Sequence, residues 1–539
     1  MTADWKPVCA LSEVPSDTPM AARVDGHRLV LVRRDDGSIA IFDDACPHEG
    51  FPLSKGTVSG GELVCPWHNF RFSLRNGACR KGDEDALPLP VQVDNGTVYV
   101  DLTPPPVEER RARLEASLTA ATLDRRNGQV ARDLVRLLRL GVSTDELLAR
   151  AIWLDARHAE WGTSHVFPLA ADVRERAKER AAVSPTEAAY VLAPVYALVS
   201  ESHVRRSPRV PPPPGTVPDD LTATLRELLA QEDELAFEAT VRAAVLEPLP
   251  LQDIQDALIA CASDHLLSFG HPLIYISKLM RLPPMPNDWK VDVLGTLAFR
   301  FATATKEDGI PAWSGFHRWM ASVGEAHSAS AAGSLEGDVD ALHAAFENAR
   351  AIDALTGLHT AAMNGLHPDL LCQVLVRAAS ERILRFDCSI DADPTLQDGW
   401  LDITHRLTTA IAVAQVRHRL SWTDWLRMYF TTAFWVHRCK AADLPAAPPS
   451  TPATVPTPAE LARQIDRALN ESTVRSIFLA HHVKTIVAAA QASTVTGDPA
   501  PWQAALHFVD SPLREARGAS QVGDAIRLVV DGKVPRTRT

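Results

Sequence analysis

The stretch CPHEGFPLSKGTVSGGELVCPWH, residues 46–68, contains two short groups of metal-ligand side chains. The first group is Cys46-x-His48, the second is Cys65-x-x-His68, and sixteen residues separate them. A structural zinc site would usually present paired Cys-x-x-Cys motifs, and this stretch has none. The pattern therefore predicts a metal centre that two cysteines and two histidines hold between two loops.

The wider motifs CPHEGFPLSKG, CPWHNFRFSLRNGAC and LPLPVQVDNGTVYV resemble the ferredoxin-type Rieske domain of bacterial oxygenases and related reductase subunits. That resemblance implies a [2Fe–2S] cluster in which Cys46 and Cys65 hold one iron while His48 and His68 hold the other. High-potential respiratory Rieske proteins carry an extra, disulfide-bonded cysteine in each loop. Here other residues occupy those positions, which favours the lower-potential class.

Two kinds of hydrophobic pattern divide the chain of 539 residues. Residues 1–103 alternate apolar and polar residues between DDG, RNG and DNG turns, which predicts a small all-β domain. Residues 104–124 are expected to be a linker and a first helix. Apolar residues at helical spacing then predict a large all-α domain over 125–539. Its proline-rich segments near 207–220 and 444–458 are expected to be surface linkers.

Internal helical repeats are a further feature of the large domain. The segment TDELLARAIWLDARHAEWGTSH (144–165) resembles LQDIQDALIACASDHLLSFGH (251–271), and HPDLLCQVLVRAASERILRFD (367–387) keeps their apolar frame. Histidines recur at matching places in the first two copies: His158 and His165, then His265 and His271. Such recurrence predicts a site between related helices. Near the end, IRLVVDGKV (526–534) is expected to form a short hairpin.

The helical domain also resembles the questin oxidase-like family, whose members oxidatively open anthraquinone-type rings. The resemblance lies in SFGHPLIYISKL (268–279), LDITHRLTTAIAVAQ (401–415) and AHHVKTIVAAAQA (480–492). In that family four histidines and, in some members, a carboxylated lysine hold iron. Motif by motif, the resemblance implies these iron ligands and catalytic residues here: His165, His271, His405, His482 and Lys484. The family's fungal members have no Rieske domain, so this chain departs from them at its front end.

Several ligand assignments stay open at this point. The motifs do not choose between His481 and His482, or between His265 and His271. Two further histidines, His158 and His359, are reserve ligands, whereas His437 and His507 are expected to be structural. A di-iron centre is a rival, because a carboxylate and a histidine three residues apart share a helix face. Two pairs have that spacing: Asp155 with His158, and Asp402 with His405.

Composition restricts the partners. A net charge of −12 and a pI near 5.9 argue against nucleic-acid binding. With no apolar run of membrane-spanning length, no signal segment and eight scattered cysteines, a cytoplasmic protein is expected. The absence of a GxGxxG fingerprint implies that NAD(P)H acts only through a separate ferredoxin or flavin reductase. A homo-oligomer is compatible with the sequence.

Together these patterns predict an oxygenase that combines the Rieske cluster with a second, non-haem Fe(II). It would use O2 to hydroxylate or cleave an organic substrate, aromatic or polycyclic, with electrons arriving through the cluster. Two alternatives belong to other classes. One is a non-catalytic electron carrier whose helical domain is a docking scaffold. The other is an oxidation in which the substrate reacts with O2 without a metal in the helical domain.

Overall fold

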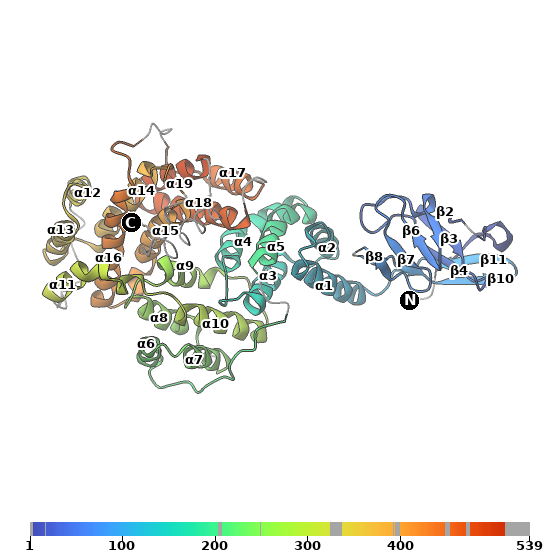
Figure 1. Ribbon diagram of the computed structural model, residues 1–539, viewed down its shortest axis with the longest axis horizontal. Helices are drawn as coiled ribbons and strands as arrows, with labels where there is room; N and C mark the ends of the chain where they lie inside the picture. Colours follow the sequence, from blue (N-terminus) through green and yellow to red (C-terminus); the bar gives the residue numbers. More distant parts are fainter. Residues whose placement is uncertain are drawn as a thin grey trace, which may run out of the picture. The chain divides into compact units, whose positions relative to one another are not determined.

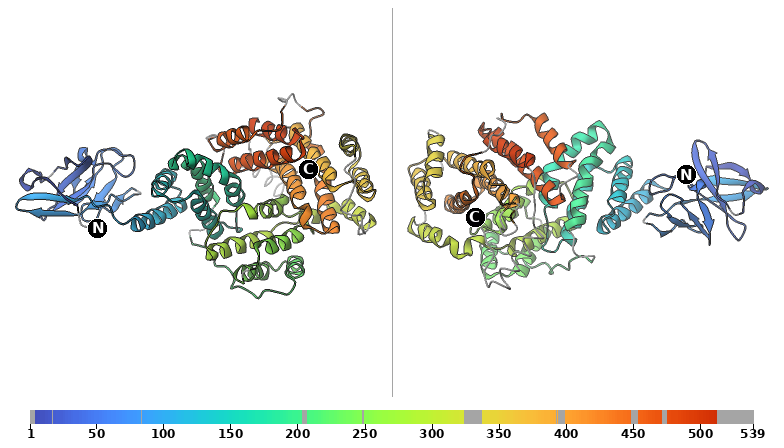
Figure 2. Two further views of the ribbon diagram at one scale, coloured as in Figure 1. Left: turned by 180° about the vertical axis from the view of Figure 1, so that it is seen from behind. Right: turned by 45° about the horizontal axis from the view of Figure 1, so that its top comes forward.

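The computed structural model describes residues 4–511 except 17, 83, 203–206, 248, 324–336, 392, 394–398, 448–452 and 471–474. The chain divides between Leu118 and Thr119 into two compact units, which are described separately (Figure 1). Strands make up the first unit and helices the second, as Figure 2 shows from two other sides. The prediction of a small β domain followed by a large helical domain is confirmed.

Three antiparallel sheets form the N-terminal unit. The first has the order β1–β11–β10, from Trp5–Ala10, Thr97–Asp101 and Val91–Asp94. The second has the order β2–β3–β4–β9, from Met20–Val24, His27–Arg33, Ile39–Asp43 and Pro88–Leu89. The third has the order β5–β6–β7–β8, from Thr57–Ser59, Glu62–Val64, Arg71–Ser73 and Cys79–Lys81.

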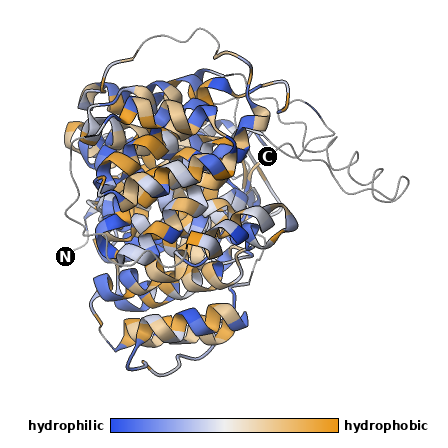
Figure 3. Cartoon of the chain, turned by 90° about the vertical axis from the view of Figure 1, so that its left-hand side faces the viewer, coloured by the Kyte–Doolittle hydropathy of each residue, from blue (hydrophilic) through white to orange (hydrophobic). Residues whose placement is uncertain are grey.

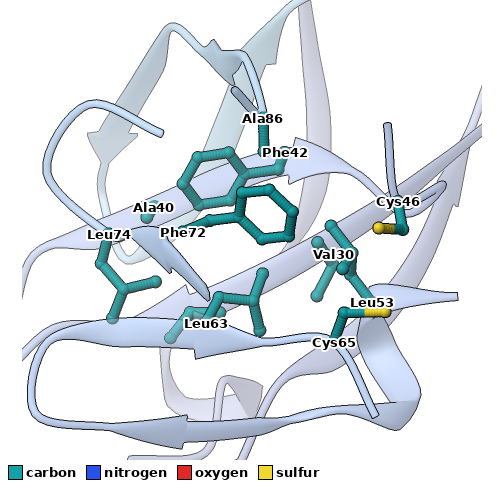
Figure 4. Packing of buried hydrophobic residues seen from close by; sticks show 11 residues of the cluster. Val30, Ala40, Phe42, Cys46, Leu53, Leu63, Cys65, Phe72, Leu74 and Ala86 are labelled. Carbon is teal, nitrogen blue, oxygen red and sulfur yellow. The ribbon is translucent and has the colours of Figure 1, made fainter. Parts of the chain in front are cut away.

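Strand β3 explains how so small a unit has a core. Successive side chains of a strand point to opposite faces of a sheet. Val30 and Val32 pack into one hydrophobic cluster, whereas Leu29 and Leu31 pack into another. The Val30 cluster also includes Cys46 and Cys65, so the sheet core reaches the two metal-ligand loops (Figure 4).

The second unit is a set of packed helices, which begins within α1. The helices are α1 Val107–Leu123, α2 Asn127–Arg139, α3 Thr144–His158, α4 Val166–Val183, α5 Ala189–Ser202, α6 Leu221–Gln231, α7 Glu234–Leu246, α8 Leu251–Ala262, α9 His271–Ser277, α10 Asn287–Ala302, α11 Ser314–Val323, α12 Val339–Asn348, α13 Ala351–Met363, α14 Pro368–Arg385, α15 Trp400–Val416, α16 Trp422–Arg438, α17 Pro458–Leu469, α18 Ser476–Thr496 and α19 Ala500–Asp510. Hydrophobic and hydrophilic stretches alternate along these helices in Figure 3, as expected where one face of a helix packs and the other faces water.

Helices α15 and α18 form the centre of the packing. Helix α15 packs against α9, α14, α16 and α18, and α18 also packs against α4, α17 and α19. All residues of α18 from Phe478 to Ala490 are buried, including the polar ones. A helix buried on every side belongs to the interior of a domain, so polar groups on it require partners or a function.

The first proline-rich segment differs from a simple surface linker. Between α5 and α6 the chain has no regular structure over 207–220, but the Arg209 guanidinium forms two hydrogen bonds, of 2.8 and 2.6 Å, with the buried Glu238 carboxylate. This buried pair holds the segment against α7. In the second segment, 448–452 lie outside the described residues, as does the hairpin expected at 526–534. Among the helices described, none is long and apolar enough to cross a membrane.

Candidate metal centres

Two loops with the same backbone conformation carry the N-terminal metal motifs. In the first, the Cys46 N–H donates to the Phe51 carbonyl at 2.9 Å and the Gly50 N–H to the Cys46 carbonyl at 2.8 Å. In the second, Cys65 donates to Phe70 at 2.8 Å and Asn69 donates to Cys65 at 3.1 Å. The fourth residue after each cysteine, Gly50 or Asn69, has a left-handed backbone, which glycine and asparagine tolerate best.

The four ligands converge at the ends of these loops. The Cys46 and Cys65 thiols are buried in the same hydrophobic cluster (Figure 4). The His48 and His68 rings are 4.8 Å apart between centroids, and the His48 ring stacks on Phe70 at 4.6 Å. Two buried thiols beside two less buried imidazoles fit a [2Fe–2S] cluster with one iron on sulfur and the other on nitrogen.

A second convergence lies inside the helical unit. Four imidazoles from four separate segments come together so that one ligand atom of each lies within 4.8 Å of the others. This group, here called the four-histidine cluster, consists of His165, His271, His405 and His481. His165 precedes α4, His271 begins α9, and the other two lie within α15 and α18. The packing of α15 and α18 at the centre of the unit therefore brings the group together.

Two of the imidazoles have their orientation fixed by the backbone. The Nδ1 atom of His271 is 2.5 Å from the Ser268 carbonyl, and Nδ1 of His481 is 2.7 Å from the Ile477 carbonyl. A carbonyl only accepts hydrogen bonds, so each Nδ1 carries the proton and each Nε2 keeps a free lone pair. Backbone acceptors of this kind commonly orient the histidines that bind metals.

The distances between Nε2 atoms suit a metal ion. His271 Nε2 is 3.1 Å from His165 Nε2, and His481 Nε2 is 3.2 Å from His405 Nε2. Nitrogens bound at about 2.1 Å lie about 3.0 Å apart at a right angle and about 3.4 Å apart at a tetrahedral angle. The same separations allow hydrogen bonds within two histidine pairs when no ion is bound. The cluster therefore suits either a metal or two imidazole pairs.

The electrostatics keep these imidazoles neutral. Burial is the largest effect: it lowers the pKa of His271 to about 3 and holds the pKa of the other three histidines well below 6.5. The Lys484 ammonium, if charged, would lower each of them further. A metal ion needs unprotonated imidazole, so this environment favours binding through nitrogen.

An unusual backbone precedes His271. Three consecutive residues, Ser268, Phe269 and Gly270, have φ values of 41°, 57° and 80°. Two of these are not glycine, and such conformations are costly unless the surroundings stabilise them. The turn places the Ser268 carbonyl on the His271 ring and the Phe269 ring 6.5 Å from that of His405. Strain is thus concentrated beside the cluster.

A buried carboxylate organises the turn before His165. The Asp155 carboxylate accepts hydrogen bonds from the Ser164 N–H at 2.7 Å and the Ser164 hydroxyl at 2.6 Å. Burial raises the pKa of Asp155 to about 6, in spite of these donors. Asp155 therefore positions the residue next to His165. Among the described residues, no carboxylate joins the four-histidine cluster, and Asp402 pairs instead with Arg406.

The structure separates the two histidines that the motifs left open on α18. His481 is in the cluster, whereas the His482 ring packs against Phe508 of α19, 4.7 Å away. His482, named above as a ligand, is thus placed on another side of the helix. Lys484, the other predicted residue on α18, is buried and lines a cavity next to the cluster, and its Nζ has no hydrogen-bond partner among the described residues.

Spacing could have distinguished the two histidines. A lysine three residues after His481 shares its face of the helix, whereas His482 lies about 100° further round. If Lys484 belongs to the site, His481 belongs to it as well. That inference needed only the sequence AHHVK.

The remaining candidates lie outside the cluster. Nδ1 of His265 is 3.0 Å from the Asp308 carboxylate, and this contact stabilises the loop that carries His265. His158 is buried at the end of α3. The other three histidines contact aromatic rings or a backbone carbonyl. His359 lies against Trp319 and Phe430. His437 Nε2 is 3.1 Å from the Ala349 carbonyl, and His507 lies against Trp400.

Comparison with known proteins addresses the N-terminal unit. Residues 4–91 match the Rieske [2Fe–2S] domain family. The chain is 33% identical over 102 residues to the anthranilate 1,2-dioxygenase ferredoxin subunit of Burkholderia cepacia, covering 94% of that protein and 19% of this chain. It is 33% identical over 101 residues to the phthalate 4,5-dioxygenase oxygenase subunit of Pseudomonas putida, covering 23% of that protein and 18% of this chain.

A third relative is the oxidoreductase NdmD of Pseudomonas putida, 28% identical over 114 residues, which are 19% of each chain. The chain thus spans about a fifth of the length of the two Pseudomonas proteins. All three similarities lie in the Rieske part, and the prediction of that domain is confirmed. By name, two of these relatives are subunits of dioxygenases and the third is an oxidoreductase.

Proposed function

The chain belongs to the Rieske [2Fe–2S] family through its N-terminal domain, and on that premise we propose that it is an oxygenase with a second iron in the helical domain. The Rieske cluster would accept electrons from a separate ferredoxin or flavin reductase and deliver them to an iron in the four-histidine cluster. The observation that carries the proposal is the convergence of four neutral imidazoles inside a buried helical core.

The choice of iron rests on the two domains taken together. Imidazole ligands suit zinc, copper, nickel and iron alike, so the four-histidine cluster alone does not select a metal. A Rieske cluster transfers single electrons, which argues against zinc because zinc has no redox chemistry. Of the redox-active ions that imidazole binds, iron is the one we propose. The chemistry that a bound iron supplies is dioxygen activation. The protein's part is to keep the imidazoles neutral by burying them and to orient two of them, His271 and His481, through backbone carbonyls.

Lys484 is the proposed source of negative charge at this site. Four neutral imidazoles leave a divalent ion uncompensated, and no carboxylate joins them among the described residues. Burial, followed by the nearby Lys278, holds the pKa of Lys484 well below its usual value, which favours the neutral amine. A neutral amine can add to CO2: an N–C bond forms, a proton leaves, and an anionic carbamate oxygen results. His481 and Lys484 share one face of α18, as joint ligands require.

The proposed substrate is an organic molecule, aromatic or polycyclic, and O2 is the oxidant. NAD(P)H would act only through the reductase, since the sequence contains no GxGxxG fingerprint. The rival without catalysis is an electron carrier in which the histidines form two hydrogen-bonded pairs. Nε2 separations of 3.1 and 3.2 Å are also compatible with that alternative.

Iron and acid-labile sulfide per chain, measured on anaerobically purified full-length protein, separate these functions. We expect about two sulfides and about three irons, because the [2Fe–2S] cluster accounts for two of each. In His271→Ala the iron should fall to about two while sulfide stays unchanged. His418→Ala, a substitution of an exposed histidine, is the control and should keep the third iron. Two irons in the unsubstituted chain would support the carrier or the metal-free oxidation, and four would support a di-iron centre.

A further inference from the structure

A cavity of about 260 Å³ adjoins the four-histidine cluster. Helices α9, α15 and α18, which carry three of the four histidines, also line this cavity. Its lining residues are Ile274, Ser277, Lys278, Arg281, Thr408, Ile411, Ala412, Gln415, Lys484, Ala488 and Gln491. The cavity and the proposed iron site therefore share their walls.

Each of the three walls is a helix that carries a histidine, and the lining residues follow that histidine at the same spacing on all three. Counting from the histidine, lining residues occur after three, seven and ten positions on every wall, and after six on two of them, Ser277 and Ile411. This spacing keeps them on one helix face. On α9 and the turn after it they are Ile274, Lys278 and Arg281; on α15, Thr408, Ala412 and Gln415; on α18, Lys484, Ala488 and Gln491. Ten helical residues span about 15 Å. The cavity thus extends toward the surface from a level about one helical turn beyond the three histidines.

The inner and outer parts of the cavity differ in polarity. Ile274, Thr408 and the buried Lys484 line the part nearest the cluster. Apolar groups of Ile411, Ala412 and Ala488 line the middle. At the outer end the Gln415 amide donates to Gln491 at 3.2 Å, and this pair is exposed. Arg281 lies at the same level and is partly exposed.

Positive charge exceeds negative charge along the wall that carries Lys278, in the middle of the cavity, and Arg281, at its outer end. The buried Asp172 carboxylate contacts both the Lys278 ammonium and the Arg281 guanidinium, the latter at 3.3 Å. One carboxylate thus faces two cations. Arginine has five N–H donors in a planar fork that suits a carboxylate, and one terminal nitrogen of Arg281 is engaged with Asp172. The other N–H groups of Arg281 can donate hydrogen bonds to an anion bound in the cavity.

We propose that this cavity binds the substrate of the proposed oxygenase, and that the substrate is a small aromatic acid. The carboxylate would bind Arg281 at the mouth, and the ring would lie between Ile274, Ile411 and Ala488 with its far edge toward the four-histidine cluster. A cavity of 150 Å³ can hold benzene, so about 260 Å³ accommodates a substituted ring or two fused rings. The inference rests on the proposed function for its chemistry but not for its binding geometry.

Binding measured without turnover tests the inference. Isothermal titration calorimetry of the anaerobic full-length chain would compare benzoate, 1-naphthoate and biphenyl-4-carboxylate with the matching neutral amides. We expect at least one acid to bind, and its amide to bind about 10- to 100-fold more weakly because it lacks the charged hydrogen bond. Arg281→Gln should weaken the binding of the acid by a similar factor and leave the affinity for the amide unchanged. Arg467→Gln, an exposed arginine on α17, is the matched control.

A second variant tests the position of the ring. Ala488→Phe fills the apolar part, so it should weaken both acids and amides, with circular dichroism and iron content as checks of folding. The inference is wrong if no acid binds, if amides bind as well as acids, or if Arg281→Gln leaves acid affinity unchanged. Acid binding retained in His271→Ala after loss of the third iron would keep the cavity and separate it from the iron site. A third iron with no acid binding would leave the proposed function standing and remove the cavity from it.

Discussion

The two adjacent histidines of α18 have different neighbours because successive residues of a helix are about 100° apart around its axis. His481 meets the His405 ring, and His482 meets Phe508. Both side chains are buried, so burial alone does not identify a ligand. The hydrogen bond from Nδ1 of His481 to Ile477 is the feature that prepares it to bind a metal.

Substitution of these neighbours should have opposite effects on iron content. His481→Ala should remove the third iron, because it deletes one of the four proposed ligands. His482→Ala should retain that iron and lower the melting temperature, because it deletes packing against Phe508. Iron and sulfide analysis with a thermal melt would measure both. Loss of iron in His482→Ala with retention in His481→Ala would reverse the assignment.

Asp155 should make stability depend on pH in a defined direction. Burial raises its pKa to about 6, so between about pH 4 and about pH 6 the folded chain keeps a proton that the unfolded chain releases. The free energy of unfolding should therefore fall as pH rises through this window, by up to about 1.4 kcal/mol per pH unit. Asp155→Asn should flatten this part of the profile, since it removes the titration and keeps an acceptor for Ser164.

Calorimetric melts at pH 4.5, 5.5 and 6.5 would measure that difference between variant and unsubstituted chain. Asp510→Asn, at an exposed position on α19, is the control and should follow the unsubstituted profile. Parallel profiles for Asp155→Asn and the unsubstituted chain would contradict the assigned protonation. An additional loss of the third iron in the variant would indicate that the Ser164 turn positions His165.

At the scale of elements, the turn before α9 is tightly constrained by the helix it packs against. Gly270 has φ of 80°, and a Cβ atom there would lie 2.1 Å from the Thr409 hydroxyl oxygen. The turn therefore requires glycine for its backbone and for its close approach to α15. His271 follows directly, so any shift of this turn moves a proposed ligand.

Gly270→Ala should destabilise the helical unit by roughly 2–4 kcal/mol, through left-handed strain and overpacking against Thr409. It should also lower the content of the third iron. Gly357→Ala in α13 is the matched control, since a Cβ atom there meets nothing within 4 Å. That change should stabilise by about 0.5–1 kcal/mol through helix propensity. Denaturant unfolding with iron analysis would compare them, and equal effects would contradict the argument.

The repeated helices were partly predictable from sequence. The histidines that the first two copies place in register, His165 and His271, come within 3.1 Å through Nε2. His165 directly precedes α4 and His271 begins α9, whereas the repeat pattern indicated only that the two histidines belong to a site between related helices. The left-handed turn at 268–270 was not predictable, because Ser268 and Phe269 are ordinary residues that only the tertiary contacts force into that conformation. The Asp155 link to Ser164 also depends on how α3 and α4 meet.

At the scale of the whole molecule, the two units should lose function separately. Cys46→Ala should remove the [2Fe–2S] cluster and abolish oxygen consumption driven by NADH and a reductase, because one cluster ligand is lost. The helical unit has its own core and should keep its fold and its third iron. Dithionite should then still reduce that iron directly. Retained reductase-driven turnover in Cys46→Ala would contradict the role of the cluster as internal electron donor.

The division into a β unit and a helical unit followed from periodicity and turn residues alone. The change from strands to helices falls between β11, which ends at Asp101, and α1, which begins at Val107, as the pattern near residue 103 indicated. The N-terminal ligands were also predictable, because their spacing is local in sequence. The helical site depends on contacts between helices that are distant in sequence. The sequence could therefore reduce the number of candidate ligands but could not identify all four. Arg209 shows the same limit, since its partner Glu238 lies 29 residues away.

The long separations between the four clustered histidines have a consequence for biosynthesis. The pair that meets at α4 and α9 is 106 residues apart, and the pair that meets at α15 and α18 is 76 residues apart. A ribosome that has not yet released α18 has made three of the four, so a nascent chain cannot assemble the set. The full set of four therefore forms only after α18 has been made and packs against α15. Before an ion binds, the paired imidazoles can hydrogen-bond to one another, as the Nε2 separations of 3.1 and 3.2 Å allow.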